Sequence, residues 1–365
     1  MDNSNRKKLF IVRREPGGIG GAEKVAHRFV ESFAKHYETE LVHSGRVIDG
    51  FKIKGTKGPS WLKCLRFADS AREFIAKNPK ALVLSMERGV PGTIYRAGDG
   101  VHANWQKYKY ANKFKRILNP MNYLLPKLEK ISVEKSNYVI ANSKLVKRHF
   151  EKLYLSFPRD RISVVYNGCD DRTFRRLPCA EKNKVRKKWN YSEEDLNLLF
   201  SGSGWERKGL AWVFELTKLL SAKGLNVKVW VAGRGDKDRF WKLAKRLKIR
   251  ECVQFLGSVK NVEELYQISD CMIMPTKYDA FSNSCLEALA CGCPIVTSTQ
   301  NGASELIDGT NGMIIDLGNS HAINEARDYV IRIKENGKEI NWDNFSDSFK
   351  NEREIQQYCK FLESP

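Results

Sequence analysis

The stretch Tyr278-Asp-Ala-Phe-Ser-Asn-Ser-Cys-Leu-Glu-Ala-Leu-Ala-Cys-Gly-Cys-Pro-Ile-Val296 predicts a loop, a helix and the start of a strand. The short apolar run Cys271–Met274 just before it is typical of a buried strand, and Gly292 with Pro294 ends the helix. Strand, loop, helix and strand together form the repeating unit of a parallel α/β sheet. Polar side chains on such a loop lie at the carboxyl edge of the sheet, where open α/β folds bind ligands.

The same alternation extends outward over the whole chain of 365 residues, which is longer than one core usually supports. Two α/β domains are therefore expected, at residues 1–168 and 189–344, joined by a polar, basic linker at 169–188. The strands expected in the first domain are Leu9–Val12, Ala81–Ser85, Tyr138–Ala141 and Arg161–Tyr166. Those expected in the second are Leu198–Ser201, Val227–Ala232, Val253–Leu256, Cys271–Met274 and Pro294–Thr297.

The net charge of +20 is concentrated in one half of the chain. Residues 1–170 hold 33 Lys and Arg against 16 Asp and Glu, a net of +17, whereas residues 171–365 hold 30 against 27, a net of +3. This division indicates that the first half faces an anionic partner, either nucleic acid or a membrane surface. The sequence has no apolar run of the roughly 18 residues that a membrane span needs. A cytoplasmic protein whose nine cysteines stay reduced is expected.

Two carboxylates of the quoted stretch are candidate ligand-binding groups. Asp279 lies on the strand-to-helix loop, and Glu287 lies in the following helix, from which it can reach ribose hydroxyls. Backbone N–H groups at a helix start bind anions, because they are unsatisfied and the helix dipole is positive there. The residues expected to open this helix are Asn283, Ser284 and Cys285.

A second candidate element is the loop that follows the strand ending at Ser201. It contains Gly202 and Gly204 and continues into Arg207 and Lys208. Glycines allow the backbone to approach a diphosphate, and the two cations neutralise charge that grows as a nucleotide leaves. A basic helix start would be unfavourable for the helix dipole, which favours a functional interpretation of this pair.

These motifs resemble the retaining glycosyltransferases of the large family that includes sucrose, glycogen and lipopolysaccharide-core transferases. The family signature is two acidic residues separated by seven others, followed by Ala-x-x-x-Gly-x-Pro, and the match here is Asp279, Glu287 and Ala288 to Pro294. The first acid is usually Glu, so Asp279 departs from the pattern. The resemblance implies a GT-B fold, α/β with two Rossmann-like domains facing across a cleft. It also implies that residues 345–365 pack back on the first domain.

The resemblance assigns roles to these residues. Asp279 would bind the donor sugar and Glu287 the ribose, while Arg207 and Lys208 would stabilise the leaving diphosphate. In the family an Arg commonly stands just after the first glycine of the loop. Here that place is Gly202, so Arg207 would take over the role of the missing Arg, as in the lipopolysaccharide-core subgroup.

The first half has a glycine-rich loop between a strand and a helix. Its glycines Gly17, Gly18, Gly20 and Gly21 do not form the dinucleotide pattern Gly-x-Gly-x-x-Gly. The family has such a loop at this place, reaching the donor and the acceptor, so Gly18, Gly20 and Gly21 are candidate donor-binding residues. A tight turn without a ligand remains the alternative.

The segment Ile94-Tyr-Arg-Ala-Gly-Asp-Gly-Val-His-Ala-Asn-Trp105 supplies two candidate catalytic residues. Asp99 would orient or deprotonate the acceptor hydroxyl. His102 would donate a hydrogen bond to the donor sugar, as many relatives use a His in this region, or it is structural. Glu87, after the strand Ala81–Ser85, is a third and weaker candidate.

Basic and aromatic residues alternate from Trp105 to Lys135, with eight Lys and Arg and only two acids. This composition favours the interface of an anionic membrane, although nucleic-acid binding or a solvated basic helix would use the same residues. The resemblance favours an anionic, lipid-linked glycan acceptor at the inner membrane, and no nucleic acid. The residues expected to face the membrane are Lys107, Lys109, Lys113, Lys115 and Arg116.

The sequence thus predicts transfer of a hexose, with glucose as the first choice, from a nucleotide sugar, with UDP as the first choice, to a lipopolysaccharide core or another lipid-linked glycan. The protein would act on the cytoplasmic face of the inner membrane without a metal or cofactor, the nucleotide sugar being a co-substrate. Three alternatives stay open: a GT-B sugar-nucleotide epimerase, a basic nucleic-acid-binding protein, and a transferase-like scaffold without activity.

Overall fold

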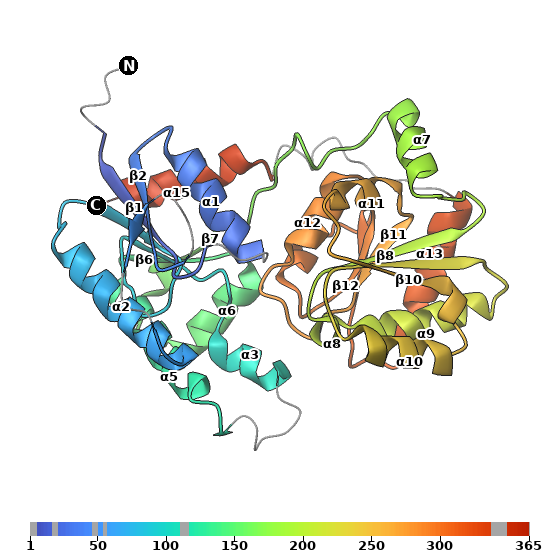
Figure 1. The fold of residues 1–365 in the computed structure, drawn as a ribbon, viewed down its shortest axis with the longest axis horizontal. Helices are drawn as coiled ribbons and strands as arrows, with labels where there is room; N and C mark the ends of the chain where they lie inside the picture. The colour runs from blue at the N-terminus through green and yellow to red at the C-terminus, as the bar shows by residue number, and fades with distance from the viewer. Residues whose placement is uncertain are drawn as a thin grey trace. The chain divides into compact units, whose positions relative to one another are not determined.

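The computed structural model describes residues 6–16, 21–45, 50–53, 57–109, 117–336 and 349–364, with the side chains of 21–24 and 109 excepted. The chain divides into two compact units. The first comprises Met1–Gly168 and Asn351–Pro365, and the second comprises Cys169–Lys350. Each unit is an α/β domain built on one parallel sheet (Figure 1).

The first unit has, within the described residues, a seven-stranded sheet in the order β3-β2-β1-β4-β5-β6-β7. All of its strand pairs are parallel. The strands are β1 Lys8–Val12, β2 Glu38–His43, β3 Phe51–Lys52, β4 Leu82–Ser85, β5 Ile94–Arg96, β6 Tyr138–Ala141 and β7 Ile162–Val164.

Helices cover both faces of this sheet. Successive side chains of a strand point to opposite faces, so each strand contributes to both cores. On β1, Leu9 and Ile11 pack in the core that contains α1 and α15, whereas Phe10 and Val12 pack in the core that contains α2 and α5. The helices are α1 Gly21–Phe33, α2 Ser60–Ala76, α3 His102–Lys109, α5 Met121–Lys135, α6 Lys144–Leu153 and α15 Asn351–Glu363 (Figure 1).

The chain leaves the first unit at Gly168 and re-enters it at Asn351, and Arg28 of α1 holds the two points together. Its guanidinium donates to the Gly168 carbonyl oxygen at 2.7 Å and to the Glu354 carboxylate at 2.6 Å. The same carboxylate accepts from the Gly168 N–H at 2.8 Å. Because Glu354 is buried, this arrangement ties α15 firmly to the first unit.

The second unit has, in the part of the chain that the structure describes, a six-stranded parallel sheet in the order β10-β9-β8-β11-β12-β13. Its central strands β8 and β11 are entirely buried, as expected for a parallel sheet with helices on both faces. The strands are β8 Leu196–Ser201, β9 Val227–Ala232, β10 Val253–Gly257, β11 Cys271–Met274, β12 Ile295–Ser298 and β13 Gly312–Ile315.

Helices α9 and α10 lie on one side of the second sheet and α11 and α12 on the other (Figure 1). The helices of this unit are α7 Cys179–Lys188, α8 Trp205–Lys208, α9 Leu210–Ser221, α10 Lys237–Arg246, α11 Val262–Ile268, α12 Asn283–Ala290 and α13 Ala322–Asn336. Gly209 joins α8 to α9 with φ +85°, and a side chain there would collide with the Pro275 carbonyl oxygen.

The structure confirms the expected fold of two Rossmann-like α/β domains. The strands predicted from apolar runs are present, with ends that shift by at most two residues. The prediction missed β2, β3, β5 and β13, which are partly exposed or very short. Residues 169–188, expected to be a linker, belong to the second unit and contain the helix α7.

Candidate functional site

The second unit has a topological switch point between β8 and β11. From β8 the chain continues to β9 and β10 on one side, and β11 then pairs with β8 on the other side. The loops that follow β8 and β11 therefore leave the sheet in opposite directions, which opens a crevice at its carboxyl edge. Arg207 and Lys208 follow β8, and Asp279 follows β11. The topology thus brings together three residues that the sequence predicted as a donor site.

The carboxylate of Asp279 pairs with both cations. Its Oδ2 lies 3.3 Å from Nη1 of Arg207 and 3.7 Å from Nζ of Lys208. The side chains of Lys208 and Asp279 are only 12% and 16% exposed, so solvent screens this attraction weakly. Arg207 also donates to the Tyr278 carbonyl oxygen. The sugar-binding acid and the diphosphate-binding cations predicted from sequence therefore neutralise one another here.

One argument from the sequence is corrected by this geometry. Arg207 and Lys208 were expected at a helix start, where cations are disfavoured. They instead occupy the last turn of the four-residue helix α8, and α9 begins only after Gly209. Cations at a helix C-terminus are favoured by the dipole. The functional interpretation of the pair therefore rests on its position at the switch point and on its contact with Asp279.

The backbone of Asp279 is fixed by the loop after β12. The Asp279 N–H donates to the Gln300 carbonyl oxygen at 3.0 Å, and the Asp279 carbonyl oxygen accepts from the Gly302 N–H at 2.9 Å. These two bonds form an isolated parallel bridge between Asp279 and Asn301. The carboxylate is consequently presented on a rigid segment, although Asp279 stands on a loop.

Glu287 is oriented by a tyrosine that the sequence analysis did not identify. The Tyr266 hydroxyl donates to Oε2 of Glu287 at 3.1 Å and is hydrogen-bonded to Oγ of Ser201 at 2.8 Å. Burial, and then the charge of Glu287, raise the pKa of Tyr266 well above its ordinary value, so the phenol remains a donor. Ser201 ends β8, and Tyr266 therefore links Glu287 of α12 to the strand that precedes Arg207 and Lys208.

The start of α12 agrees with the expected position, since the helix begins at Asn283. The Cys285 N–H, however, already donates to the Ser282 carbonyl oxygen at 3.1 Å, so this group is engaged within the helix. Cys285 is buried, and its Sγ accepts from the Asn301 amide at 3.4 Å. Asn283 and Ser284 are half-buried and remain the anion-binding candidates of this helix start.

In the first unit, Asp99 follows β5 and lies between two arginines. Its Oδ2 is 3.4 Å from Nη1 of Arg13, which follows β1, and 3.7 Å from Nη1 of Arg88, which follows β4. Partial burial favours the neutral acid, but the two guanidinium groups outweigh it and lower the pKa of Asp99. The side chain is 45% exposed and can meet a ligand. An acid with a lowered pKa is suited to accepting a hydrogen bond rather than a proton.

His102 is the first residue of α3 and is only 5% exposed. Its ring lies against Trp105 in a tilted arrangement with 5.3 Å between the centroids, and its backbone N–H donates to Oε2 of Glu129 at 3.0 Å. The burial indicates a structural contribution to the turn after Asp99. The hydrogen bond between His102 and the donor sugar stays a prediction.

Glu129 of α5 is the main residue that sequence reasoning missed in this unit. Its side chain is 1% exposed and accepts from Nε of Arg88 at 2.9 Å and from the Tyr154 hydroxyl at 2.8 Å. Arg88 also donates to the Gly100 carbonyl oxygen at 2.8 Å. Glu129 therefore holds the loop of Asp99 at both ends, through Arg88 and through the His102 N–H. The signal in the sequence was that Glu129 is one of only two acids within the strongly basic stretch from Trp105 to Lys135.

The glycine loop of the first unit lies mostly outside the described residues. Gly18 and Gly20 are not described, and Gly21 is the first residue of α1. The expected helix after the loop is therefore present, whereas the ligand role of its glycines stays a prediction. Glu87 accepts a hydrogen bond from the Arg14 N–H at 3.1 Å, which joins the ends of β4 and β1.

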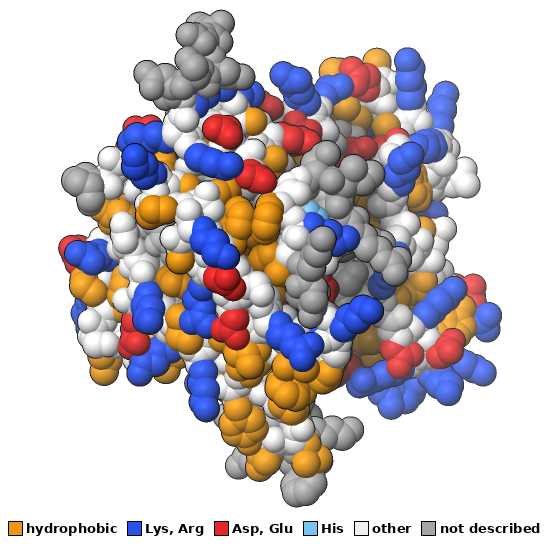
Figure 2. All heavy atoms as spheres, turned by 60° about the vertical axis from the view of Figure 1, so that its left-hand side comes forward, with side chains coloured by type: hydrophobic (Ala, Val, Ile, Leu, Met, Phe, Trp, Pro, Cys, Tyr) orange, Lys and Arg blue, Asp and Glu red, His pale blue; other side chains and the backbone are white. Residues whose placement is uncertain are grey.

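The basic and aromatic stretch of the first unit carries exposed apolar side chains. Tyr108, Ile117, Leu118 and Tyr123 are 38%, 59%, 67% and 55% exposed. Hydrophobic side chains gather at the lower end of the face shown in Figure 2, with Lys and Arg nearby. Of the predicted membrane-facing residues, Lys107 is exposed on α3 and Lys109 is its last residue, with a side chain outside the description. Lys113, Lys115 and Arg116 lie outside the described residues.

None of the described helices is long and apolar enough to cross a membrane. Likewise, no three His, Cys, Asp or Glu side chains in the described part of the chain are grouped so that they would hold a metal ion.

The family model described as Glycosyltransferase Family 4 matches residues 19–173, and the model described as Glycosyl transferases group 1 matches residues 181–342. A lipopolysaccharide 1,2-N-acetylglucosaminetransferase of Salmonella typhimurium is 28% identical over 187 residues, which are 48% of this chain and 47% of that protein. The chain spans about half of the length of this and several other curated relatives that it matches.

Two solved structures share the fold over nearly the whole chain. WaaG, a glycosyltransferase involved in lipopolysaccharide biosynthesis, has a TM-score of 0.76 and 18% identity, with 97% of each chain covered. Anabaena HepE, solved in complex with UDP-glucose, has a TM-score of 0.74 and 16% identity, with 98% of this chain and 100% of that chain covered. The chain therefore belongs to the GT-B glycosyltransferases, with a family 4 domain followed by a group 1 domain, and is related to enzymes of lipopolysaccharide and O-antigen biosynthesis.

Proposed function

We propose that this chain transfers a hexose, with glucose as the first candidate, from a UDP-linked donor to a lipopolysaccharide core or another lipid-linked glycan, with retention of configuration. The observation that carries the proposal is the convergence of Arg207, Lys208 and Asp279 at the switch point of the second sheet. The UDP-glucose complex of HepE and the lipopolysaccharide role of WaaG support the choice of donor and acceptor.

Charge stabilisation by side chains is the basis of the proposed mechanism. As the bond between the sugar and the diphosphate breaks, negative charge grows on the diphosphate, and Arg207 and Lys208 lie where they would stabilise it. The start of α12, at Asn283 and Ser284, would add backbone donors. We propose that these groups act without a divalent metal ion. The acceptor hydroxyl would attack on the face from which the diphosphate leaves.

The ion pairs of Asp279 have a consequence for donor binding. The donor diphosphate must compete with Asp279 for Arg207 and Lys208, and the sugar hydroxyls then become new partners of the carboxylate. A complete donor satisfies all three side chains, whereas a nucleoside diphosphate without sugar leaves Asp279 beside the phosphates. Asp279 would thereby favour the complete donor over the product, which assists product release.

Asp99 would act on the acceptor by orientation. Its pKa is lowered by Arg13 and Arg88, so it is a weak proton acceptor at neutral pH and a good hydrogen-bond acceptor. We propose that it aligns the acceptor hydroxyl and that the proton leaves with the departing diphosphate.

The proposal is tested first by replacing Glu287 with alanine. Ribose hydroxyls are common to UDP, GDP and ADP sugars, so the expected result does not depend on the base or the sugar. Donor affinity should fall roughly 10- to 100-fold, because hydrogen bonds to a charged group contribute about 1.5–3 kcal/mol. A thermal-shift screen of nucleotide sugars selects the donor, and calorimetry then measures its Kd with both proteins.

The matched control is Glu251→Ala, which removes an acid of the same unit that is 94% exposed. It should leave the Kd unchanged. Equal donor affinity for Glu287→Ala and the parent protein would refute the donor site. Turnover of the selected donor to an altered free sugar without acceptor would instead identify an epimerase.

The role of Asp279 leads to a second expected result. Asp279→Asn removes the charge that competes for Arg207 and Lys208 but keeps the shape of the side chain. Affinity for the nucleoside diphosphate alone should rise a few-fold, while turnover of the complete donor should fall. Product-inhibition constants and kcat, measured on the same preparation, test both parts. A diphosphate affinity that falls along with turnover would show that Asp279 does not compete for the cations.

The proposed membrane surface gives a third expected result. Neutralising Lys107, Lys109, Lys113 and Lys115 should release the protein from liposomes that contain anionic lipids, because each basic residue near such a surface contributes about 1 kcal/mol. Changing both Ile117 and Leu118 to Ser should also weaken binding, since these side chains are more than half exposed. Liposome co-sedimentation at several salt concentrations measures both effects.

The control for the apolar change is Ile314→Ser, because Ile314 is also exposed but belongs to the second unit. It should leave liposome binding unchanged. Binding that survives both sets of substitutions, or that is absent from the parent protein, removes the membrane from the proposal.

A further inference from the structure

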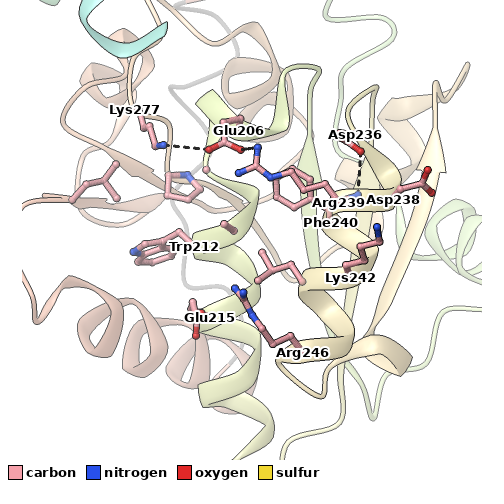
Figure 3. A pocket seen from close by; sticks show the side chains of 15 residues that line it. Glu206, Trp212, Glu215, Asp236, Asp238, Arg239, Phe240, Lys242, Arg246 and Lys277 are labelled. Atoms are coloured by element: carbon pink, nitrogen blue, oxygen red, sulfur yellow. Dashed lines mark hydrogen bonds and ion pairs between the residues drawn. The ribbon is translucent and has the colours of Figure 1, made fainter. Parts of the chain in front are cut away.

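The second unit has a groove of about 1070 Å³ that the donor site does not use. Helix α9 runs through its centre, and Lys242 and Arg246 of α10 stand on one side of that helix, with Trp212 and Lys277 on the other (Figure 3). Its volume is at the upper end of the roughly 300–1,000 Å³ typical of ligand sites. The groove therefore has room for more than a single small molecule.

Trp212 is the apolar element of this groove. The core face of α9 consists of Leu210, Val213, Phe214, Leu216, Thr217 and Leu220. Trp212 is not among these buried residues and lines the groove beside Ala211 and Pro275. A half-exposed indole next to a small side chain offers a flat apolar surface, and the core of α9 does not account for it.

The charges that line the groove as a whole are balanced. The acidic lining residues are Glu206, Glu215, Asp236 and Asp238. The basic ones, equal in number, are Arg239, Lys242, Arg246 and Lys277. A groove with no net charge has little attraction for a phosphate or another polyanion. It does offer many hydrogen-bond donors and acceptors side by side.

The ion pairs that Glu206 forms within the groove are weak. Glu206 contacts Arg239 at 2.8 Å and Lys277 at 3.8 Å, and all three side chains are more than half exposed (Figure 3). Such exposed pairs contribute little to stability, so their groups can exchange partners at small cost. A ligand hydroxyl both donates and accepts, and it can bridge a carboxylate and a cation that already stand together.

We propose that this groove binds a neutral oligosaccharide, with a sugar ring stacked on Trp212 and its hydroxyls bridging the charged pairs of the rim. A sugar has an apolar face of C–H groups and an edge of hydroxyls, which matches a groove that holds one indole and balanced charges. The open trough suits a chain of several sugars. Glu206 immediately precedes Arg207 and Lys208, so the groove would hold a glycan chain next to the helix that carries the diphosphate-binding cations.

Titration of the full chain with maltotriose, cellotriose and chitotriose tests the proposal, with trigalacturonate as the anionic comparison. Binding is followed by tryptophan fluorescence and by ligand-observed NMR. At least one neutral trisaccharide should bind, and its affinity should change little between low and high salt. Trp212→Ala should weaken it roughly tenfold or more, whereas Trp212→Phe should retain part of the affinity.

Two comparisons separate this site from the donor site. Glu287→Ala should bind the trisaccharide like the parent protein, and Trp212→Ala should bind the nucleotide sugar like the parent protein. Donor affinity that is unchanged in Glu287→Ala would thus refute the proposed donor site and leave the groove intact. The inference is overturned if none of the neutral trisaccharides binds, if their binding is the same in Trp212→Ala, or if only trigalacturonate binds.

Discussion

Replacing Lys208 with methionine is expected to lower kcat roughly 10²–10³-fold, the effect typical of removing one group that stabilises charge in a transition state. The Lys208 side chain is 12% exposed and lies 3.7 Å from Asp279, so its charge acts in a poorly screened site. Methionine has nearly the same length and fills the space beneath Gly202, where Lys208 packs. The loss should therefore reflect charge rather than packing, and steady-state kinetics with the selected donor and acceptor measure it.

Two further variants make the Lys208 result specific. Lys208→Arg keeps the charge and should recover a substantial part of kcat, although the guanidinium is bulkier. Lys218→Met removes an exposed lysine of the same unit, on α9, and should leave kcat unchanged. A Lys208→Met protein that folds normally and keeps kcat within a few-fold of the parent would remove Lys208 from the proposed mechanism.

Replacing Glu129 with alanine is expected to destabilise the first unit by about 3–5 kcal/mol, because it takes the buried carboxylate partner from Arg88 and leaves only the more distant, half-exposed Asp99 to balance its charge. The Arg88 side chain is 13% exposed and loses its bond to Glu129, and the Tyr154 hydroxyl and the His102 N–H lose their acceptor. Urea unfolding followed by circular dichroism measures the change. Since the two units need not unfold together, the midpoint of each transition is compared.

Glu129→Gln is the conservative variant, because the amide oxygen can still accept from Tyr154 or His102. It should destabilise the protein less than alanine does. The surface control is Glu73→Ala, whose carboxylate pairs with Lys77 at 2.9 Å on an exposed helix face and should be replaceable without a measurable shift. If Glu129→Ala and Glu73→Ala unfold at the same midpoint, the buried network does not hold the first unit.

The sequence identified those site residues whose neighbours in the chain define their surroundings. Glu287 was recognisable because a strand, a loop, a helix start and Gly292-Cys-Pro294 follow in order. Asp99 was recognisable because it lies in a glycine-containing loop whose segment resembles that of the lipopolysaccharide-core transferases. Arg207 and Lys208 were also found, but on an argument about a helix start that the structure overturns, since both lie in the last turn of α8.

The residues that sequence reasoning missed act across long separations in the chain. Tyr266 contacts Ser201, 65 positions away, and Glu129 contacts Arg88, 41 positions away. In both cases a helix is brought beside a strand end by the order of strands in a parallel sheet. Local sequence patterns do not reveal such pairs, because Tyr266 looks like an ordinary core tyrosine and Glu129 like an ordinary acid on a helix. The same holds for Trp212, whose position outside the core of α9 appears only once the helix is packed.

The sequence by itself determined that the protein is a two-domain α/β chain with a basic first half, and it located the motif that contains Asp279 and Glu287. These features follow from apolar periodicity, helix signals and composition, which are local properties. Only the tertiary structure decided that Asp279 pairs with Arg207 and Lys208, because that contact needs β8 and β11 to be neighbours at the switch point. It also decided the electrostatics of Asp99, since two arginines that follow different strands lower its pKa.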